Sequence, residues 1–406
     1  MASREVASVI VAGHICLDVI PEFPRSGLGF RFRPGTLVDV GPVAIAPGGC
    51  VANTGLALRR LGIRPRMMGK VGDDPFGGIL RNALAEVDRS LAEGLLVVEG
   101  EHTSYSVILS PSGMDRMALH FPGANDTFTS EDIPEADLEG ARLFHFGYPP
   151  IMRRMFEDGG ENLARLLERA KSPGLTTSLD MAYPDPSAES GRADWRRILQ
   201  VTLPHVDVFL PSLEEVLLML EPESSWEIVE GGSDALLEVP VERISRVAEE
   251  VIAMGAGVAG IKVGERGLYL RTGSVERLAG AGSAFPSALG EWANRELWTS
   301  VFEVDAIGTT GAGDATVAGF LLALLRGMAP EETITAACAV GAFSVEAADA
   351  TSSIQDWECV RARLARGWRR RDTPLDRAWR ETGQQGIWAG PRDSRGAHDP
   401  LPGGKP

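Results

Sequence analysis

The chain has 406 residues, which is enough to bury one large hydrophobic core or two modest ones. Hydrophobic residues make up 44% of it and charged residues 24%, and it has neither an apolar run of the ~18 residues that span a bilayer nor a basic-then-apolar leader. We therefore expect a cytoplasmic globular protein with no membrane partner. The formal net charge of −16 disfavours nucleic acid as a partner, because nucleic-acid binding needs a positive surface.

The spacing of cysteines and histidines argues against a disulfide framework and against a zinc site. The four cysteines stand at positions 16, 50, 338 and 359, with no C-x-x-C pair. The six histidines lack the H-x-x-x-H spacing of zinc hydrolases. Each histidine is interpreted as a packing or surface residue.

Short apolar, β-branched runs alternate with longer helical patterns along most of the chain. The predicted strands are 8–13, 143–147, 176–180, 206–210 and 258–264. The predicted helices are 51–61, 76–87, 151–170, 212–220, 242–254, 314–326 and 331–347. This alternation is typical of an α/β protein with a parallel sheet flanked by helices.

Two early regions break the alternation and have the composition of strands and a hairpin. They are 19–45, rich in Pro and Gly, and 102–122, which contains the turn PSGMD. They form either a small separate sheet or edge strands of the main sheet, and the pattern leaves both open. Segments 222–241 and 280–297 are predicted as surface insertions. From residue 366 to 406 we expect an irregular Arg/Gly/Pro-rich tail, whose tryptophans leave open that part of it docks on the body.

The stretch GTTGAGDATVAGF (308–320) runs a glycine-rich turn directly into an apolar helix. Backbone N–H groups at a helix start attract anions, and glycines let a ligand approach them closely. Asp314 would repel a phosphate there unless it takes a proton from an attacking hydroxyl, as phosphoryl transfer to an alcohol requires. The alternative is that Asp314 only caps the helix. A P-loop motif is absent, and G-x-G-x-x-G fails at Thr316.

A second glycine pair enters a helix in PGGCVANTGLALRRLG (47–62). Gly48 and Gly49 would let the backbone approach a polyol, and Asn53 offers a donor and an acceptor for vicinal hydroxyls. Asp18 follows the first strand, near the carboxyl edge where ligands of parallel sheets bind. Each of these features alone is more typical of a turn or a cap.

With both glycine motifs in this order, the chain resembles the PfkB family of carbohydrate kinases, the ribokinase-like group, from about residue 7 to about 365. GKVGDDPFG (69–77), FPGAN (121–125), LPSLEEV (210–216) and IKVGERG (261–267) follow the family order between the anchors. The resemblance implies a Rossmann-like three-layer α/β/α domain over 1–365, with a small β-sheet lid drawn from about 14–45 and 100–122. It also implies ATP and Mg²⁺, and a hydroxyl of a monosaccharide or close derivative as phosphoryl acceptor.

The resemblance also implies a role for each matching residue. Asp314 is the catalytic base, and the amides of Gly311, Ala312 and Gly313 form the anion hole. The acceptor is held by Asp18, Gly48, Gly49 and Asn53. The nucleotide is bound by Lys262, Gly264, Gly267, Thr309 and Thr310. Glu215 binds Mg²⁺ through water.

Some positions depart from the family pattern. Ser212 stands where the family's N-x-x-E element, which ends here at Glu215, has an Asn. Gly308 replaces an acid that contributes to a monovalent-cation site in some members. Asp349 stands where a glycine is common, so dependence on K⁺ is left open. Two alternatives remain, a nucleoside kinase of the same fold and a non-catalytic sugar- or nucleotide-binding regulatory protein. Relatives pair through their lids, so a homodimer is a further expectation.

Overall fold

The computed structural model describes residues 8–23, 35, 37–110, 117–373 and 375–395. Its centre is a ten-stranded sheet in the order β15-β16-β14-β13-β12-β11-β10-β9-β1-β4. Six neighbouring strands are parallel: β4 (Pro65–Met68), β1 (Val9–Gly13), β9 (Leu143–Gly147), β10 (Thr176–Asp180), β11 (Val208–Phe209) and β12 (Val258–Lys262). The antiparallel end consists of β13 (Leu268–Thr272), β14 (Glu296–Thr299), β16 (Ile387–Ala389) and β15 (Arg380–Glu381). All five predicted strands are present.

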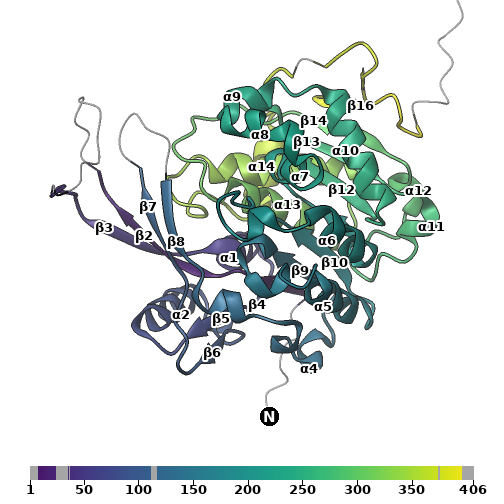
Figure 1. Ribbon diagram of the computed structural model, residues 1–406. Coiled ribbons are helices and arrows are strands. Elements are labelled where there is room, and N and C mark those ends of the chain that lie inside the picture. The colour runs from purple at the N-terminus through teal and green to yellow at the C-terminus, as the bar shows by residue number, and fades with distance from the viewer. Residues whose placement is uncertain (1–7, 24–34, 36, 111–116, 374, 396–406) are drawn as a thin grey trace, which may run out of the picture.

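Helices cover both faces of this sheet, which gives the expected three layers (Figure 1). One face carries α1 (Gly49–Arg60), α11 (Val275–Leu278), α12 (Leu289–Trp292), α13 (Ala312–Leu325), α14 (Pro330–Ser344) and α15 (Trp357–Ala365). The other carries α5 (Glu161–Lys171), α6 (Trp195–Thr202), α7 (Leu213–Leu220) and α10 (Val241–Ala253). Alternate residues of β1 serve the two cores, since Ile10 packs with the second group and Val9 and Val11 with the first.

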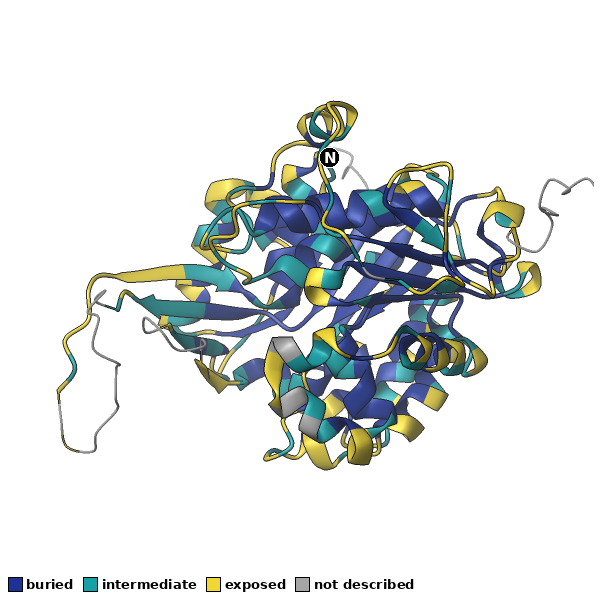
Figure 2. Cartoon of the chain, turned by 90° about the horizontal axis from the view of Figure 1, so that it is seen from above, coloured by how far each residue is buried: buried dark blue, intermediate teal, exposed yellow. Residues whose placement is uncertain are grey.

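The early irregular region forms a separate four-stranded sheet that projects from the body as a lid (Figure 1). Its order is β3 (Val43–Gly48), β2 (Cys16–Pro21), β7 (Tyr105–Leu109) and β8 (Met117–Phe121), which excludes the alternative of edge strands in the main sheet. Strands β2 and β3 change from buried at the base to more exposed toward the tip (Figure 2). Below the lid lie α2 (Pro75–Val87), α3 (Arg89–Ala92) and a two-stranded sheet, β5 (Lys70–Gly72) with β6 (Leu96–Val98).

Register divides the lid residues between two faces. Ala46, Asp18, Ser106 and His120 are directly paired across the four strands, so they share one face. Ile45, Val19, Val107 and Leu119 are paired in the next row and share the opposite face. The first face carries the polar side chains of Asp18, Ser106 and His120, and the row on the second face is apolar.

The predicted segments 151–170 and 222–241 differ in detail from the structure. The helix expected from residue 151 begins only at Glu161, because Pro149–Ile151 and Arg153–Met155 form 3-10 turns and Gly159 and Gly160 both have positive φ. Segment 222–241, predicted as a surface insertion, folds into two short helices, α8 (Pro222–Glu230) and α9 (Gly232–Leu237). A last short helix, α4 (Glu135–Leu138), precedes β9.

Segment 280–297 is not a surface insertion, and that prediction was wrong. Trp292 is fully buried, with its ring 5.1 Å from that of Phe285 and 6.4 Å from that of Phe320. Arg295 is 1% exposed, and β14 begins at the next residue. The scattered polar residues of this segment hid its burial, because they are paired inside the protein.

The segment after 366, which the sequence predicts to be irregular, contributes β15 and β16 to the antiparallel end of the main sheet. Trp368 stacks on Phe302 with ring centroids 4.6 Å apart. Asp393 lies 2.9 Å from the buried Arg295 guanidinium, which also pairs with Glu331 at 2.6 Å. The described parts of this segment, 367–373 and 375–395, therefore dock on the body. Within the described residues, every helix is too short or too polar to cross a bilayer.

Candidate active site

The glycine-rich turn lies at the start of α13, whose residues from Ala315 to Leu324 are buried except Thr316. Gly311 adopts φ 73° and ψ 3° as the N-cap, and a Cβ there would overlap the Cβ of Ala350. Only glycine meets both conditions without strain. The Ala312 amide makes a 3.3 Å bond to Thr309 O, with which an anion in this turn would compete.

Asp314 is 2% exposed and lies in the first turn of α13, two residues inside the helix. Its Oδ2 accepts hydrogen bonds from Asn53 Nδ2 at 3.0 Å and from the Tyr148 hydroxyl at 2.8 Å. Its Oδ1 accepts one from Thr54 Oγ1 at 3.4 Å. The side chain therefore bonds α1 and the segment after β9, and the capping alternative does not describe these contacts.

Burial and the neighbouring groups have opposite effects on the pKa of Asp314. Burial raises the pKa of Asp314, while hydrogen bonds from Asn53, Tyr148 and Thr54 and the positive charge of Lys262 oppose this shift. The net result is a pKa above the ordinary range of an aspartate. A carboxylate with a raised pKa is a stronger base than an ordinary aspartate, which suits it to accept a proton from a hydroxyl.

Lys262 ends β12 and lies 2.6 Å from Asp180 Oδ1 at the end of β10. Burial acts to lower the pKa of Lys262, but the carboxylates of Asp180 and Glu215 outweigh it and raise that pKa. Burial raises the pKa of Asp180 to about 7 against the opposing charge of Lys262. A Cβ on Gly313 would lie 3.5 Å from Lys262 Nζ, so the ammonium group stands beside the first turn of α13.

Glu215 lies in the first turn of α7, where its Oε2 accepts a 2.7 Å hydrogen bond from the Ser212 backbone N–H. Its negative charge raises the pKa of Asp180, and Ser212 pairs with Lys262 in an isolated β-bridge. Ser212, at the position where the family pattern has an asparagine, is thus the N-cap of α7 and lies beside Lys262. The structure therefore brings Glu215 to the same carboxyl edge as Lys262 and Asp180.

The glycine pair ahead of α1 allows two side chains to lie against the backbone. A Cβ on Gly48 would overlap the Asp18 carboxylate, and one on Gly49 would lie 2.5 Å from His14 Nδ1. Gly49 also has φ 80°, which favours glycine. These predicted acceptor residues, with Asn53 in the first turns of α1, are gathered between the lid and Asp314.

The predicted nucleotide residues occupy two turns. Gly264 (φ 51°) and Gly267 (φ 109°) bound the turn between β12 and β13, directly after Lys262. A Cβ on Gly267 would overlap Thr299 O, so this turn packs closely on the end of β14. Thr309 and Thr310 precede the N-cap of α13.

Two positions bear on monovalent cations. Asp349 Oδ1 accepts hydrogen bonds from the backbone N–H groups of Thr351 (3.0 Å) and Ser352 (2.6 Å), so it braces its own turn. A Cβ on Gly308 would lie 2.9 Å from Ala347 O, in the same turn region. Within the described ranges, three or more His, Cys, Asp or Glu residues are nowhere grouped so as to hold a metal ion.

Sequence reasoning missed five residues of this site: His14, Thr54, His120, Tyr148 and Asp180. His14 is 2% exposed, and among the described residues its ring nitrogens have no hydrogen-bond partner. The His120 ring lies 5.1 Å and the Tyr148 ring 6.1 Å away. His14, Tyr148 and Asp180 each lie at the carboxyl end of a parallel strand. The rule that singled out Asp18 would therefore have found them too.

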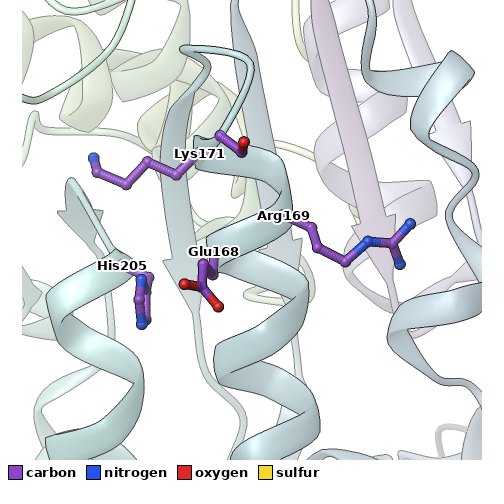
Figure 3. Close-up of a pocket in the computed structure, with 5 residues that line it drawn as sticks. Glu168, Arg169, Lys171 and His205 are labelled. Carbon is purple, nitrogen blue, oxygen red and sulfur yellow. The ribbon is translucent and has the colours of Figure 1, made fainter.

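A separate hollow of 460 Å³ lies at the opposite edge of the sheet and is lined by Glu168, Arg169, Lys171, Ser172 and His205. Glu168 and His205 face one another, whereas Arg169 points away from them (Figure 3). These residues precede the amino ends of β10 and β11. The hollow is thus remote from Asp314.

The fold and site define a class of α/β protein with a small separate β-sheet and a buried carboxylate at a helix start. The chain matches the pfkB family carbohydrate kinase model over residues 6–357. It therefore belongs to the pfkB family and is a sugar kinase of the ribokinase-like fold.

Several relatives and solved structures are similar to this chain. An uncharacterized sugar kinase of Archaeoglobus fulgidus is 27% identical (68% of this chain, 89% of the relative), and a probable fructokinase-4 of Arabidopsis thaliana is 26% identical (79% and 83%). An ATP-dependent ribose-1-phosphate kinase of Halopiger xanaduensis is 26% identical (73% and 79%). The Arabidopsis thaliana ribokinase with ribose and ATP has a TM-score of 0.64 at 18% identity (88% and 99%). A putative ribokinase II of E. coli with ATP and Mg²⁺ has a TM-score of 0.64 at 19% identity (89% and 99%).

Proposed function

We propose that this protein transfers the γ-phosphoryl group of ATP to a hydroxyl of a monosaccharide or close derivative, with Asp314 as general base. One observation carries the proposal. The buried Asp314 carboxylate lies between Asn53, from the helix behind the predicted acceptor turn, and the α13 turn that predicts an anion hole. A base must stand where the acceptor hydroxyl meets the phosphate, and Asp314 stands between the residues predicted for each.

Each residue then has a defined task. Asp18, Asn53 and the Gly48–Gly49 turn hold the acceptor so that one hydroxyl faces Asp314, which takes its proton. The acceptor oxygen attacks the γ-phosphorus, the bond to the β-phosphate oxygen breaks, and ADP leaves. Lys262 and the amides of residues 311–313 stabilise the negative charge, and the residues predicted to bind the nucleotide are Gly264, Gly267, Thr309 and Thr310.

The residues present fit a Mg²⁺ ion that takes most of its ligands from phosphate and water. Asp180 Oδ2 is buried and has no hydrogen-bond partner among the described atoms, and Glu215 is close enough to raise the Asp180 pKa. We propose that Glu215, through water, and Asp180 hold the ion. Mg²⁺ binds to proteins through one or two carboxylates in this way, and it neutralises phosphate charge during transfer.

We propose a kinase domain over residues 1–365, in which the lid drawn from about 14–45 and 100–122 closes the acceptor site. The outer face of the lid also supports a homodimer. Five apolar side chains on it are 39% to 56% exposed: Val43, Ile45, Met117, Leu119 and Phe121. An apolar sheet face of this kind is stabilised by pairing with a second copy. Leu119→Lys should convert a dimer into a monomer in light scattering, whereas Leu237→Lys, on α9, should not; a monomeric wild type would reject the dimer.

The function is tested by acceptor-dependent ADP release with Mg²⁺ over a panel of sugars, sugar acids, sugar phosphates and nucleosides, with and without K⁺. We expect a monosaccharide or close derivative to be phosphorylated. Asp314→Asn should lower kcat by about 10²–10⁴ with acceptor binding retained, since it removes the general base, whereas the exposed Asp372→Asn should not. Preference for a nucleoside would favour the nucleoside-kinase alternative. Sugar binding with no ATP consumption across the panel would favour the regulatory alternative and reject the proposal.

A further inference from the structure

The Tyr148 hydroxyl donates a 2.8 Å hydrogen bond to Asp314 Oδ2, the same kind of bond that an acceptor hydroxyl must make before it loses its proton. The Tyr148 phenol and an acceptor hydroxyl are each one O–H group on a carbon atom, so each can donate one hydrogen bond. The phenol therefore occupies a hydroxyl position on the base while no acceptor is present. The same oxygen also accepts from Asn53 at 3.0 Å, which leaves little room for a third donor.

The backbone of Tyr148 is held in an unfavourable conformation. Its φ of 69° and ψ of 39° lie in the left-handed region, which is an outlier for a bulky side chain. Pro149 follows it, and a residue before proline prefers extended backbone. Such strain persists where surrounding contacts enforce it, and it is concentrated at functional sites. Here Pro149 and Pro150 are buried, and the Tyr148 N–H donates a 3.3 Å hydrogen bond to Asp180 O, so the backbone on both sides of the side chain is held in place.

The burial of Tyr148 and Asp314 differs as expected if the tyrosine covers the carboxylate. Asp314 is 2% exposed, whereas Tyr148 is half-buried and partly accessible. The ring also lies 6.1 Å from that of the buried His14, whose other neighbour is the lid residue His120. Of the two groups that share this hydrogen bond, Tyr148 is therefore the more accessible.

We propose that Tyr148 is a positioning residue that keeps the acceptor's place on Asp314 and excludes water from it until the acceptor displaces the phenol. This inference rests on the proposed function of Asp314 as base. Its consequence is that ATP is not hydrolysed while the acceptor is absent.

The reaction that Tyr148 prevents is ordinary ATP hydrolysis. Without the phenol, a water molecule bonds to Asp314 Oδ2 and gives up a proton to it. The water oxygen attacks the γ-phosphorus, the bond between that phosphorus and the β-phosphate oxygen breaks, and ADP leaves with the electron pair. The products are ADP, inorganic phosphate and a proton, with no further reactant.

The test is acceptor-free ATP hydrolysis with Mg²⁺, followed by phosphate release. Tyr148→Phe should hydrolyse ATP about 10-fold or more faster than the wild type, a part of the 10²–10⁴ that a general base contributes. Tyr148→Phe combined with Asp314→Asn should lose this gain. Tyr105→Phe removes the same hydroxyl from a tyrosine on the apolar face of the lid, and it should leave the hydrolysis rate unchanged.

A second variant guards against misfolding. Tyr148→Gly suits the positive φ and also removes the phenol, so it should hydrolyse ATP faster even if Tyr148→Phe is unstable. Hydrolysis at the wild-type rate in folded Tyr148→Phe and Tyr148→Gly would overturn the inference, as would a gain that survives Asp314→Asn.

The two proposals fail separately. Acceptor phosphorylation that needs Asp314, with no gain in either Tyr148 variant, removes only the role of Tyr148. A gain that needs Asp314, with no acceptor phosphorylated by the wild type, supports Tyr148 and removes the proposed acceptor class.

Discussion

Lys262 and Asp180 form a buried 2.6 Å ion pair that joins the ends of two strands, β12 and β10, beside the first turn of α13. The lysine side chain is 14% exposed and the aspartate 1%. The pair holds the Lys262 ammonium group next to the start of α13, where the anion hole is predicted. A nucleotide phosphate would then compete with Asp180 for the ammonium group.

Because of this ion pair, we expect that replacing both residues restores stability without restoring catalysis. Lys262→Met should leave Asp180 buried without its cation and lower the free energy of unfolding by about 3–5 kcal/mol. It should also lower kcat/KM for ATP about 10²-fold or more, through lost charge stabilisation. Lys262→Met with Asp180→Asn should recover much of the stability and none of the activity. Denaturant unfolding and steady-state kinetics measure both, and recovered activity in the double variant would contradict the role of Lys262.

The raised pKa of Asp314 predicts the acid limb of the pH profile. A base with a raised pKa loses its negative charge at a higher pH than an ordinary aspartate, so kcat/KM should fall as pH falls through that raised pKa. Asn53→Leu removes a 3.0 Å donor to the ionised form and should move the limb to higher pH, and Thr54→Val, which removes a 3.4 Å donor, should move it less. Titratable groups that face Asp314 are Cys16, Cys50, Tyr148, Asp180 and Lys262. A limb that stays fixed in both variants would exclude Asp314 as its source.

His14 predicts a contribution to acceptor affinity. Burial lowers the pKa of His14, aided by His120, so its imidazole is neutral and offers one donor and one acceptor. Because neither ring nitrogen has a hydrogen-bond partner in the part of the chain that the structure describes, we expect an acceptor hydroxyl to bond to one of them. His14→Ala should raise the acceptor KM about 3- to 10-fold, as expected for one hydrogen bond, with the KM for ATP unchanged. His14→Asn should restore part of it, and His205→Ala, at the opposite edge of the sheet, should have no effect.

The site residues that follow a glycine turn stand out in the sequence, whereas those marked only by the end of a strand are easily missed. Asp314 and Asn53 stand 261 positions apart, yet each follows a glycine turn that enters a helix, and the structure places them 3.0 Å apart. Tyr148 and Asp180 follow no glycine turn. The strand-end rule marks both as candidates, but their contacts depend on which strands are neighbours in the sheet. The parallel strands follow from apolar runs. Burial of Arg295 does not, because its partners Glu331 and Asp393 are distant in sequence.

The close packing around Gly49 predicts that adding one methyl group, in Gly49→Ala, lowers both stability and acceptor binding. A Cβ would lie 2.5 Å from His14 Nδ1 and 2.8 Å from His14 O, on a backbone with φ 80°. Gly49→Ala should therefore lower the melting temperature and weaken acceptor binding together. Gly78→Ala is the matched control, since nothing lies within 4 Å of its Cβ and the position is exposed in α2. It should be neutral or stabilising by about 0.5–1 kcal/mol, and equal losses in both variants would refute the steric argument.

The C-terminal segment predicts a stability role that is independent of catalysis. Asp393 Oδ2 accepts hydrogen bonds from Arg295 Nε at 2.9 Å and from the Glu296 N–H at 3.0 Å. Asp393→Ala leaves a buried guanidinium with a single carboxylate, Glu331, and a buried N–H unpaired, so the free energy of unfolding should fall by about 3 kcal/mol. The exposed Asp372→Ala should change it by less than about 0.5 kcal/mol. Because Arg295 and Asp393 lie at the antiparallel end of the sheet, kcat below the melting temperature should be unaffected. A loss below about 1 kcal/mol in Asp393→Ala would show that the segment after 366 is dispensable for the fold.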